Sequence, residues 1–304
     1  MSLAELKPWL LAAGRCGPAS GGARLGLCPG RGVDLRLIAA PSWSSLRDML
    51  ALGQVVAAHM LAPVPIATAV GLCGAATRLE TLMVLNLNGN TIGVSRELTA
   101  RMRAGSFGID FVDAWAAGLA LLAEGSGLRI GLPFAFSMHR DLIHYWPEGL
   151  GQPLPEGLEI YTVPPPLMAK ALAAGGIDAI CVGKPRGSVG VETGAGELLL
   201  PGSAIWAAAP EKVLATRAGW AETKPELAGR LIRALWRASR WLGQGANHSV
   251  AADVLSAPGR LAAGSEVIER VLTGWLPASS TRPIRCAETF GETKETSGPH
   301  HRSG

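Results

Sequence analysis

Charged side chains are scarce in this sequence, at 17% of its 304 residues, and the lysines and arginines form no run. Proteins that bind a nucleic-acid backbone usually carry such a run, so direct nucleic-acid binding is not expected. Long apolar runs are missing too, because stretches such as 114–123 are too short to cross a bilayer. The sequence is nevertheless 48% hydrophobic, a composition that is typical of a globular protein with a sizeable core.

Cysteine is rare and irregularly spaced. The cysteines form no Cys-x-x-Cys pair and no Cys/His spacing; they are Cys16, Cys28, Cys73, Cys181 and Cys286. Because their number is odd, neither a disulfide framework nor a structural zinc site is expected, and a reducing compartment fits best. The N-terminus also lacks the basic region and the long apolar region of a secretory signal. These absences predict a cytoplasmic protein that holds no metal and no cofactor.

Catalytic motifs are absent as well. The sequence contains no GxSxG, HExxH, P-loop or GxGxxG motif in a strand–helix context. Asp110 and Asp113 form a pair of carboxylates, but they lie near a predicted helix start, where the helix dipole alone stabilises acidic side chains. We therefore expect a binding protein rather than an enzyme.

From Val33 onward, short strand-like runs alternate with helical patterns. Residues 33–40 form a strand-like run, and residues 44–54 follow with apolar side chains at helical spacing. Repeated along the chain, this order predicts an α/β fold with a largely parallel sheet. Both ends depart from it, because residues 1–32 show no periodic pattern and the polar tail 277–304 is expected to be disordered.

Several stretches between residues 33 and 276 resemble, in order and spacing, the nitrate- and bicarbonate-binding family typified by NrtA and CmpA. They are APSWSSLRDMLALGQ, AAHMLAPVPIA, LNLNGNTIGVS, MHRDLIHYW, YTVPPPLMAKAL, IDAICVGKP and GSAIWAAAPEKVLATRAGW. The resemblance implies a type II periplasmic-binding-protein-like fold, with two α/β lobes on a hinge and a ligand cleft between them. Residues 33–105 and 200–276 are expected to form lobe I, and residues 106–199 lobe II.

The function that this resemblance implies is the binding of nitrate or nitrite. The segments PSWSSLRDML and HMLAPVPIA are most similar in sequence to NasS, a cytoplasmic nitrate/nitrite sensor. The first residues, MSLAEL, resemble the start of a cytoplasmic member of this family. A NasS-like role implies a NasT-like RNA-binding antiterminator as partner. One alternative is the periplasmic substrate-binding component of a nitrate or bicarbonate ABC transporter, with a permease as partner. A second alternative is an enzyme of thiamine-pyrimidine synthesis, which shares this fold.

Trp43 and Ser45 lie where a predicted strand gives way to a helix. Free N–H groups and the dipole at a helix N-terminus favour negative charge, so backbone amides and the Ser45 hydroxyl suit an anionic ligand there. The Trp43 indole adds a donor and a flat wall for a planar anion such as nitrate. The alternative is that Ser44 or Ser45 only caps the helix and that Trp43 is a core residue.

The resemblance adds further ligand candidates. It places an amide ligand at Asn90 and an anion-contacting histidine at His139. Without the resemblance, Asn90 would be interpreted as a turn asparagine and His139 as a surface or capping histidine. Lys184 directly follows a predicted strand, at the edge where ligands gather in open α/β sheets. Many family members carry an acid at this VGxP position, whereas a lysine favours nitrate or nitrite over bicarbonate with a metal; the alternative is an exposed surface lysine. His59, in a predicted strand, is interpreted as structural or as a residue behind the ligand contacts.

One departure from the family falls at the N-terminus. Family members begin with a strand and a PLxDAAPL turn that helps to line the anion site, and this segment is absent here. Reading residues 9–31 one nucleotide later, with permissive codon choices, gives GFLPLADAAPLVVARALGFARAE, which joins the sequence at Gly32. We hypothesise that compensating insertions or deletions have scrambled residues 7–31 of this aberrant N-terminal segment. The nucleotide sequence checks the hypothesis, which fails if the shifted frame does not encode the motif.

Overall fold

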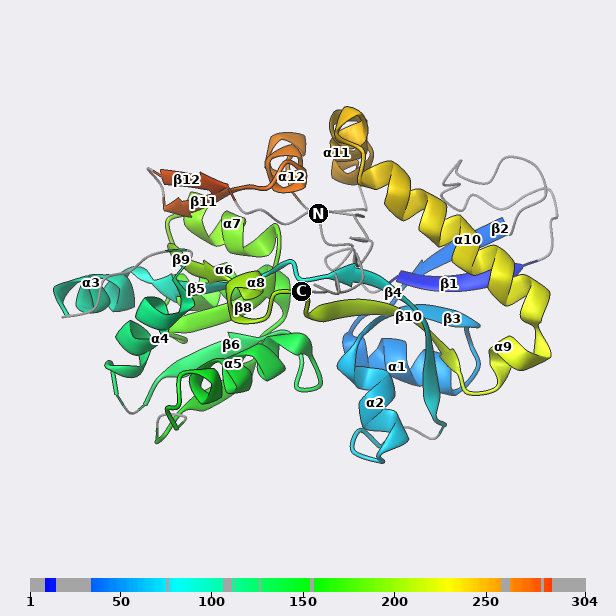
Figure 1. Ribbon diagram of the computed structural model, residues 1–304, viewed down its shortest axis with the longest axis horizontal. Helices are drawn as coiled ribbons and strands as arrows, with labels where there is room; N and C mark the ends of the chain where they lie inside the picture. Colours follow the sequence, from blue (N-terminus) through cyan, green and yellow to red (C-terminus); the bar gives the residue numbers. More distant parts are fainter. Residues whose placement is uncertain are drawn as a thin grey trace, which may run out of the picture.

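The structure, a computed structural model, describes residues 9–14, 34–74, 77–105, 111, 113–125, 127–153, 156–257, 263–279 and 282–285. Its strands form two five-stranded sheets and one two-stranded sheet. Each five-stranded sheet carries its own helices, so the molecule consists of two lobes side by side (Figure 1). The predicted two-lobe α/β architecture is therefore confirmed.

The first lobe is built on a sheet whose strands lie in the order β2 (Asp34–Ala39), β1 (Trp9–Gly14), β3 (Ala57–Leu61), β10 (Pro210–Arg217) and β4 (Leu79–Leu87). Its helices are α1 (Trp43–Ala51), α2 (Pro63–Ala69), α9 (Trp220–Thr223) and α10 (Pro225–Leu242). Leu46 and Leu50 of α1 are fully buried in one cluster with Met60 of β3. Their spacing of four residues places them on one side of α1, and this side faces the sheet.

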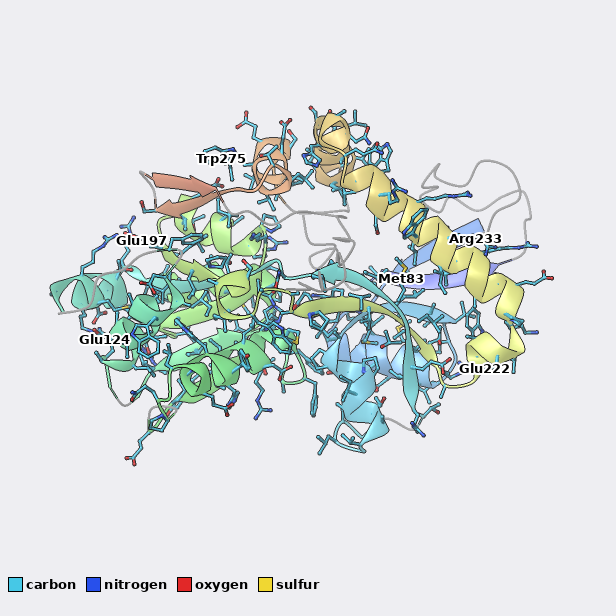
Figure 2. The ribbon with its side chains drawn as sticks, in the orientation of Figure 1. Met83, Glu124, Glu197, Glu222, Arg233 and Trp275 are labelled. Carbon is cyan, nitrogen blue, oxygen red and sulfur yellow. The ribbon has the colours of Figure 1, made fainter. Side chains whose placement is uncertain are left out.

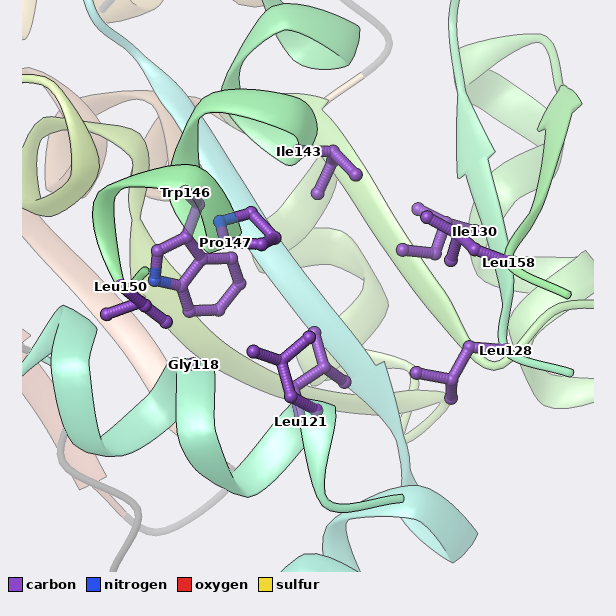
Figure 3. Close-up of a pocket in the computed structure, with 10 residues that line it drawn as sticks. Gly118, Leu121, Leu128, Ile130, Ile143, Trp146, Pro147, Leu150 and Leu158 are labelled. Carbon is purple, nitrogen blue, oxygen red and sulfur yellow. The ribbon is translucent and has the colours of Figure 1, made fainter. Parts of the chain in front are cut away.

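The strands of the second lobe lie in the order β7 (Glu159–Thr162), β6 (Arg129–Leu132), β8 (Ala179–Gly183), β5 (Asn90–Ser95) and β9 (Gly196–Pro201). Its helices are α3 (Arg96–Ala104), α4 (Ala114–Leu122), α5 (Met138–Gly149), α6 (Pro165–Ala173), α7 (Arg186–Glu192) and α8 (Gly202–Ile205). A small apolar cavity of about 20 Å³ lies between α4 and α5, lined by Leu121 and Trp146 among others (Figure 3). It is part of the packed core of this lobe.

The predicted largely parallel sheet is wrong for most strand pairs. In the first sheet, β1 is antiparallel to β2 and β3, and β10 is antiparallel to β3 and β4. In the second sheet β6 is parallel to β7 and β8, but β5 is antiparallel to β8 and β9. For the pairs that involve β5 and β10 the reason lies in the chain path, because both strands arrive directly from the other lobe and no crossover helix sets their direction.

The chain passes between the two five-stranded sheets at two places. It leaves the first sheet at Asn88–Gly89, between β4 and β5, and it returns between β9 and β10, through α8. The first passage lies earlier than the expected boundary at residues 105–106, so β5 and α3 belong with the second sheet. Asn88 and Gly89 have φ angles of 56° and 95°, which are typical of a hairpin turn, yet the strands on either side lie in different sheets.

The C-terminal segment crosses to the second lobe after α10. A short 3₁₀ helix (Gly245–Asn247), α11 (His248–Ser256) and α12 (Ser265–Leu272) follow, and β11 (Trp275–Ser279) contacts α7 and β9. The expectation of disorder from residue 277 is wrong as far as Arg285, because β11 pairs with β12 (Arg282–Arg285). Residues 286–304 lie outside the described residues, as does the aberrant N-terminal segment except for β1. Within the part of the chain described, no helix combines the length and apolarity that a membrane span requires.

Candidate functional site

The two passages between the lobes bring buried polar side chains together. Asn90 is the first residue of β5, directly after one passage, and Glu211 and Lys212 lie near the start of β10, directly after the other. His139 lies in the first turn of α5, and Trp43 is the first residue of α1. We call these five residues the hinge cluster, because they come from both lobes and from both connections between them.

Glu211 is the centre of the hinge cluster. Its side chain is fully buried, and its carboxylate accepts hydrogen bonds from the Asn90 amide (2.6 Å) and the Lys212 ammonium (2.5 Å). The His139 Nε2 atom lies 3.8 Å from the same carboxylate. Burial alone raises the pKa of Glu211, but the positive charge of Lys212, the nearby His139 and these hydrogen bonds together lower it below its ordinary value. Glu211 is therefore a buried carboxylate that is ionised at neutral pH.

Trp43 joins the cluster through Lys212. The Lys212 ammonium lies 5.4 Å from the centre of the Trp43 ring, a cation–π contact, and the lysine is 1% exposed. The structure therefore brings Trp43 to the cluster, and a ligand contact by Trp43 stays a prediction. Trp43 also packs against the core of the first lobe, so the alternative interpretation of Trp43 as a core residue is correct in part.

Ser45 is not brought to the cluster by any contact among the described residues. The residue that caps α1 is Ser42, whose hydroxyl accepts a hydrogen bond from the Ser45 N–H (3.1 Å). The Ser45 hydroxyl lies 3.0 Å from the Ser42 hydroxyl. The capping alternative that named Ser44 or Ser45 thus applies to Ser42 instead, and a ligand contact by Ser45 stays a prediction.

His139 is 3% exposed, and its burial lowers the pKa to about 4, an effect that the charge of Glu211 opposes and that of Lys212 reinforces. The imidazole is therefore neutral at pH 7. Its Nδ1 atom is buried and has no hydrogen-bond partner in the described part of the chain, and the same holds for the Asn90 Oδ1 atom. Buried polar atoms without partners are uncommon in folded proteins, so two of them beside a buried ion pair point to a site for a polar ligand.

Lys184 directly follows β8, as predicted, and is 2% exposed, so the alternative of an exposed surface lysine is wrong. Its backbone N–H donates to the Gly89 carbonyl oxygen (2.9 Å), which places its backbone next to the residue that precedes Asn90. Lys184 is thus buried at the same passage between the lobes as the hinge cluster.

His59 lies in β3, opposite Leu214 of β10, in agreement with its predicted position in a strand. Burial and, to a lesser extent, the charge of Lys212 together lower the pKa of His59 to about 3. Neither ring nitrogen has a hydrogen-bond partner among the described residues. The imidazole is therefore neutral at physiological pH.

Sequence reasoning missed Glu211 and Lys212. Both lie in PEKVLATR, and β10 is buried from Glu211 to Thr216. An adjacent acid and base at the head of an otherwise apolar strand was the available signal, since charged side chains are rarely buried unless they are paired.

The hinge cluster combines a buried ammonium, a primary amide and a neutral imidazole, which donate hydrogen bonds to oxygen atoms, with the ionised carboxylate of Glu211, which accepts them. A polar groove of about 530 Å³ lies on the second lobe, beside Arg96, Arg129 and Asp178. Among the residues that the structure describes, no group of three or more His, Cys, Asp or Glu side chains is placed to hold a metal ion.

Two hinged α/β lobes with buried donors where they join define the periplasmic-binding-protein class. The chain belongs to the NMT1-like family, whose model matches residues 11–256. It is similar to the crystal structure of the periplasmic nitrate-binding protein NrtA from Synechocystis, with 25% identity and a TM-score of 0.72 over 83% of this chain and 66% of that one. The alkanesulfonate-binding protein SsuA from Xanthomonas axonopodis shares the fold, with a TM-score of 0.56, 18% identity and coverage of 77% and 71%.

Curated relatives are named as nitrate or bicarbonate transport or binding proteins. The nitrate import ATP-binding protein NrtC of Synechococcus elongatus is 29% identical over 89% of this chain and 40% of its own length. The nitrate/nitrite binding protein NrtA of Synechocystis is 26% identical over 73% of this chain and 50% of its own length. The bicarbonate transport ATP-binding protein CmpC of Synechococcus elongatus is 27% identical over 78% of this chain and 35% of its own length. The chain thus spans half or less of the length of these relatives.

The neutral His139 predicts a specific loss of stability in acid. Its pKa is about 6.5 in the unfolded chain and about 4 in the fold, so between these values the unfolded chain binds more protons. The free energy of unfolding must therefore fall as the pH drops from 7 towards 4, and His139 alone accounts for about 2 kcal/mol of this loss at pH 5. We expect His139→Gln to remove that share, which urea unfolding at pH 7 and pH 5 measures.

A matched control for this experiment is His144→Gln. His144 lies on the same helix, outside the hinge cluster, so this variant shows how much of the effect comes from the substitution of any histidine on α5. Equal pH dependence in the wild type and His139→Gln would show that the imidazole is not held neutral.

Proposed function

We propose that this chain binds a small oxyanion, nitrate or nitrite, at the hinge cluster and serves as the substrate-binding component of an anion ABC transporter. The observation that carries the proposal is the buried Lys212 ammonium, which contacts both the Trp43 ring and the Glu211 carboxylate where the lobes join. The ligand class is supported by the nitrate- and bicarbonate-related names of the relatives described above.

The geometry of the donors suits a planar anion. The Asn90 amide and the Lys212 ammonium already bind the planar carboxylate of Glu211. A trigonal oxyanion has the same O–X–O arrangement, so these donors are suitably directed for it. An anion that enters beside ionised Glu211 meets a like charge and must share Lys212 with it. We propose that the buried Lys184 supplies the further positive charge that offsets this repulsion.

Ligand binding at a hinge also provides a conformational signal. Trp43 belongs to the first lobe and His139 to the second, so an ion held by both contacts the two lobes at once. Such contacts form fully only when the lobes are closed, and the ligand therefore shifts the population towards the closed form. In a transporter, this change would let the permease distinguish the closed, ligand-bound form of the binding protein from its empty form.

The NasS-like sensor role and its NasT-like antiterminator partner stay predictions. The relatives reported above are named as nitrate and bicarbonate transport or binding proteins, and these names describe neither a sensor nor a thiamine-pyrimidine enzyme. They favour an ABC permease as the partner. The similar crystal structure, named as that of the periplasmic nitrate-binding protein NrtA, favours the periplasmic alternative over the cytoplasmic location.

Calorimetric titration with nitrate, nitrite, bicarbonate and sulfate tests the proposal. We expect the wild type to bind nitrate or nitrite more tightly than sulfate, a dianion that the site does not neutralise. The double variant Glu211→Gln, Lys212→Met removes both buried charges together, so that neither is left unpaired in the core. It should bind nitrate about 100-fold more weakly, since loss of a buried charged partner costs about 2–5 kcal/mol. A wild type that binds none of the four anions would contradict the proposal.

Lys184→Glu tests the second cation separately. Reversal of this buried charge should weaken nitrate binding at least about tenfold, since an added carboxylate repels the anion at low dielectric. The control is Lys170→Glu, the same charge change at an exposed residue of α6, for which affinity should change less than about twofold. Both variants are compared after thermal melting has shown them folded, with Lys184→Met as a milder substitute. Unchanged nitrate affinity in folded Lys184→Glu or Lys184→Met would remove Lys184 from the site.

A further inference from the structure

A second charged feature lies on α10, the helix that follows β10 and α9 in the first lobe. Four exposed arginines follow one another at intervals of three, four and three residues: Arg230, Arg233, Arg237 and Arg240. This spacing places all four on one side of an α-helix. Figure 2 shows Arg233 extending away from the helix. We call this set the arginine stripe.

The opposite side of α10 fixes the direction of the arginine stripe. Leu231 is fully buried and Ala228 is 5% exposed, and Leu235 packs in the same apolar cluster as Leu231. This cluster lies against β4 and β10 of the first lobe. The helix cannot turn its charged side inwards without exposing this apolar surface, so the stripe is held outwards.

Most of the charge on the stripe is unbalanced. Arg230 pairs with Glu226 at 3.4 Å, but Arg233, Arg237 and Arg240 form no ion pair with any residue that the structure describes. Arg240 lies instead over the ring of Trp236, 5.0 Å from its centre, and this tryptophan is 48% exposed. Arginine and tryptophan are the side chains most enriched where proteins bind one another.

We infer that the arginine stripe docks an acidic segment of a partner protein, with Trp236 as the apolar anchor of the contact. The stripe is about 15 Å long, since ten residues separate its ends at about 1.5 Å each. One side of a helix with carboxylates at the same three-four-three spacing matches that length and charge. Arginine binds such carboxylates through bidentate hydrogen bonds, which make the contact specific in its geometry as well as attractive.

Two other anionic partners fit the stripe less well. An amphipathic helix binds a membrane by inserting its apolar side, and the apolar side of α10 is already packed on the first lobe. A nucleic acid is usually bound by more extensive positive charge than one stripe, and the lysines and arginines form no run elsewhere. A protein surface is the partner that uses both the arginines and Trp236.

The experiment uses the full chain and two synthetic helical peptides of identical composition. One carries four glutamates at the three-four-three spacing, and the other carries them scrambled around the helix. Fluorescence anisotropy at about 0.15 M salt should show at least about tenfold tighter binding of the matched peptide, because only it forms the full set of ion pairs. The variant Arg233→Glu, Arg237→Glu should lose about tenfold or more in affinity for it.

A matched control reverses two exposed cations on the second lobe, with Arg96→Glu and Lys170→Glu. Its net charge changes by the same amount, and its affinity for the matched peptide should change less than about twofold. Equal affinity for both peptides, or no measurable binding, overturns the inference. So does tighter binding to vesicles of phosphatidylglycerol or to a single-stranded oligonucleotide. Anion binding at the hinge cluster is measured separately, so its failure would leave this result intact.

Discussion

The ion pair between Glu211 and Lys212 is the constraint around which the centre of the molecule is organised. Both side chains are at most 1% exposed, and the removal of two charges from water is costly unless hydrogen bonds and attraction offset it. Here the Asn90 amide, the Trp43 ring and the nearby His139 complete the set of partners. Each of these neighbours comes from a different element, so the pair ties together the start of α1, the start of α5 and both passages between the lobes.

The same constraint explains why the site lies where it does. A buried ion pair needs polar neighbours, and chain passages provide them because backbone and side chains there are not committed to the core of either sheet. Asn90 and Glu211 meet across 121 residues of sequence, at the two points where the chain changes lobes. The geometry of the hinge cluster therefore depends on the relative position of the two lobes, because its residues come from both.

Sequence reasoning predicted much of the fold and only part of this cluster. Strand–helix alternation from Val33 and the resemblance to a known family predicted two α/β lobes, and the placement of His139 at a helix start and Lys184 after a strand agrees with the structure. Strand direction was not predictable in this way, since β5 and β10 enter their sheets from the opposite lobe. Glu211 and Lys212 were missed although an adjacent acid and base stand at the head of an apolar strand, because Asn90, which binds the Glu211 carboxylate, is 121 residues away in the sequence.

The C-terminal segment adds a third link to the two passages between the lobes. After α10 leaves the first lobe, α12 and β11 pack on the second, where Leu272 and Leu276 share an apolar cluster with Val191 and Leu198. Two neighbouring chain connections alone would let the two lobes rotate widely about them. The C-terminal segment is a third connection, at a distance from the other two, and its ends must move apart or together when the angle between the lobes changes. It therefore restricts the rotation to a narrow range. Any rotation of the two lobes relative to each other should accordingly be small.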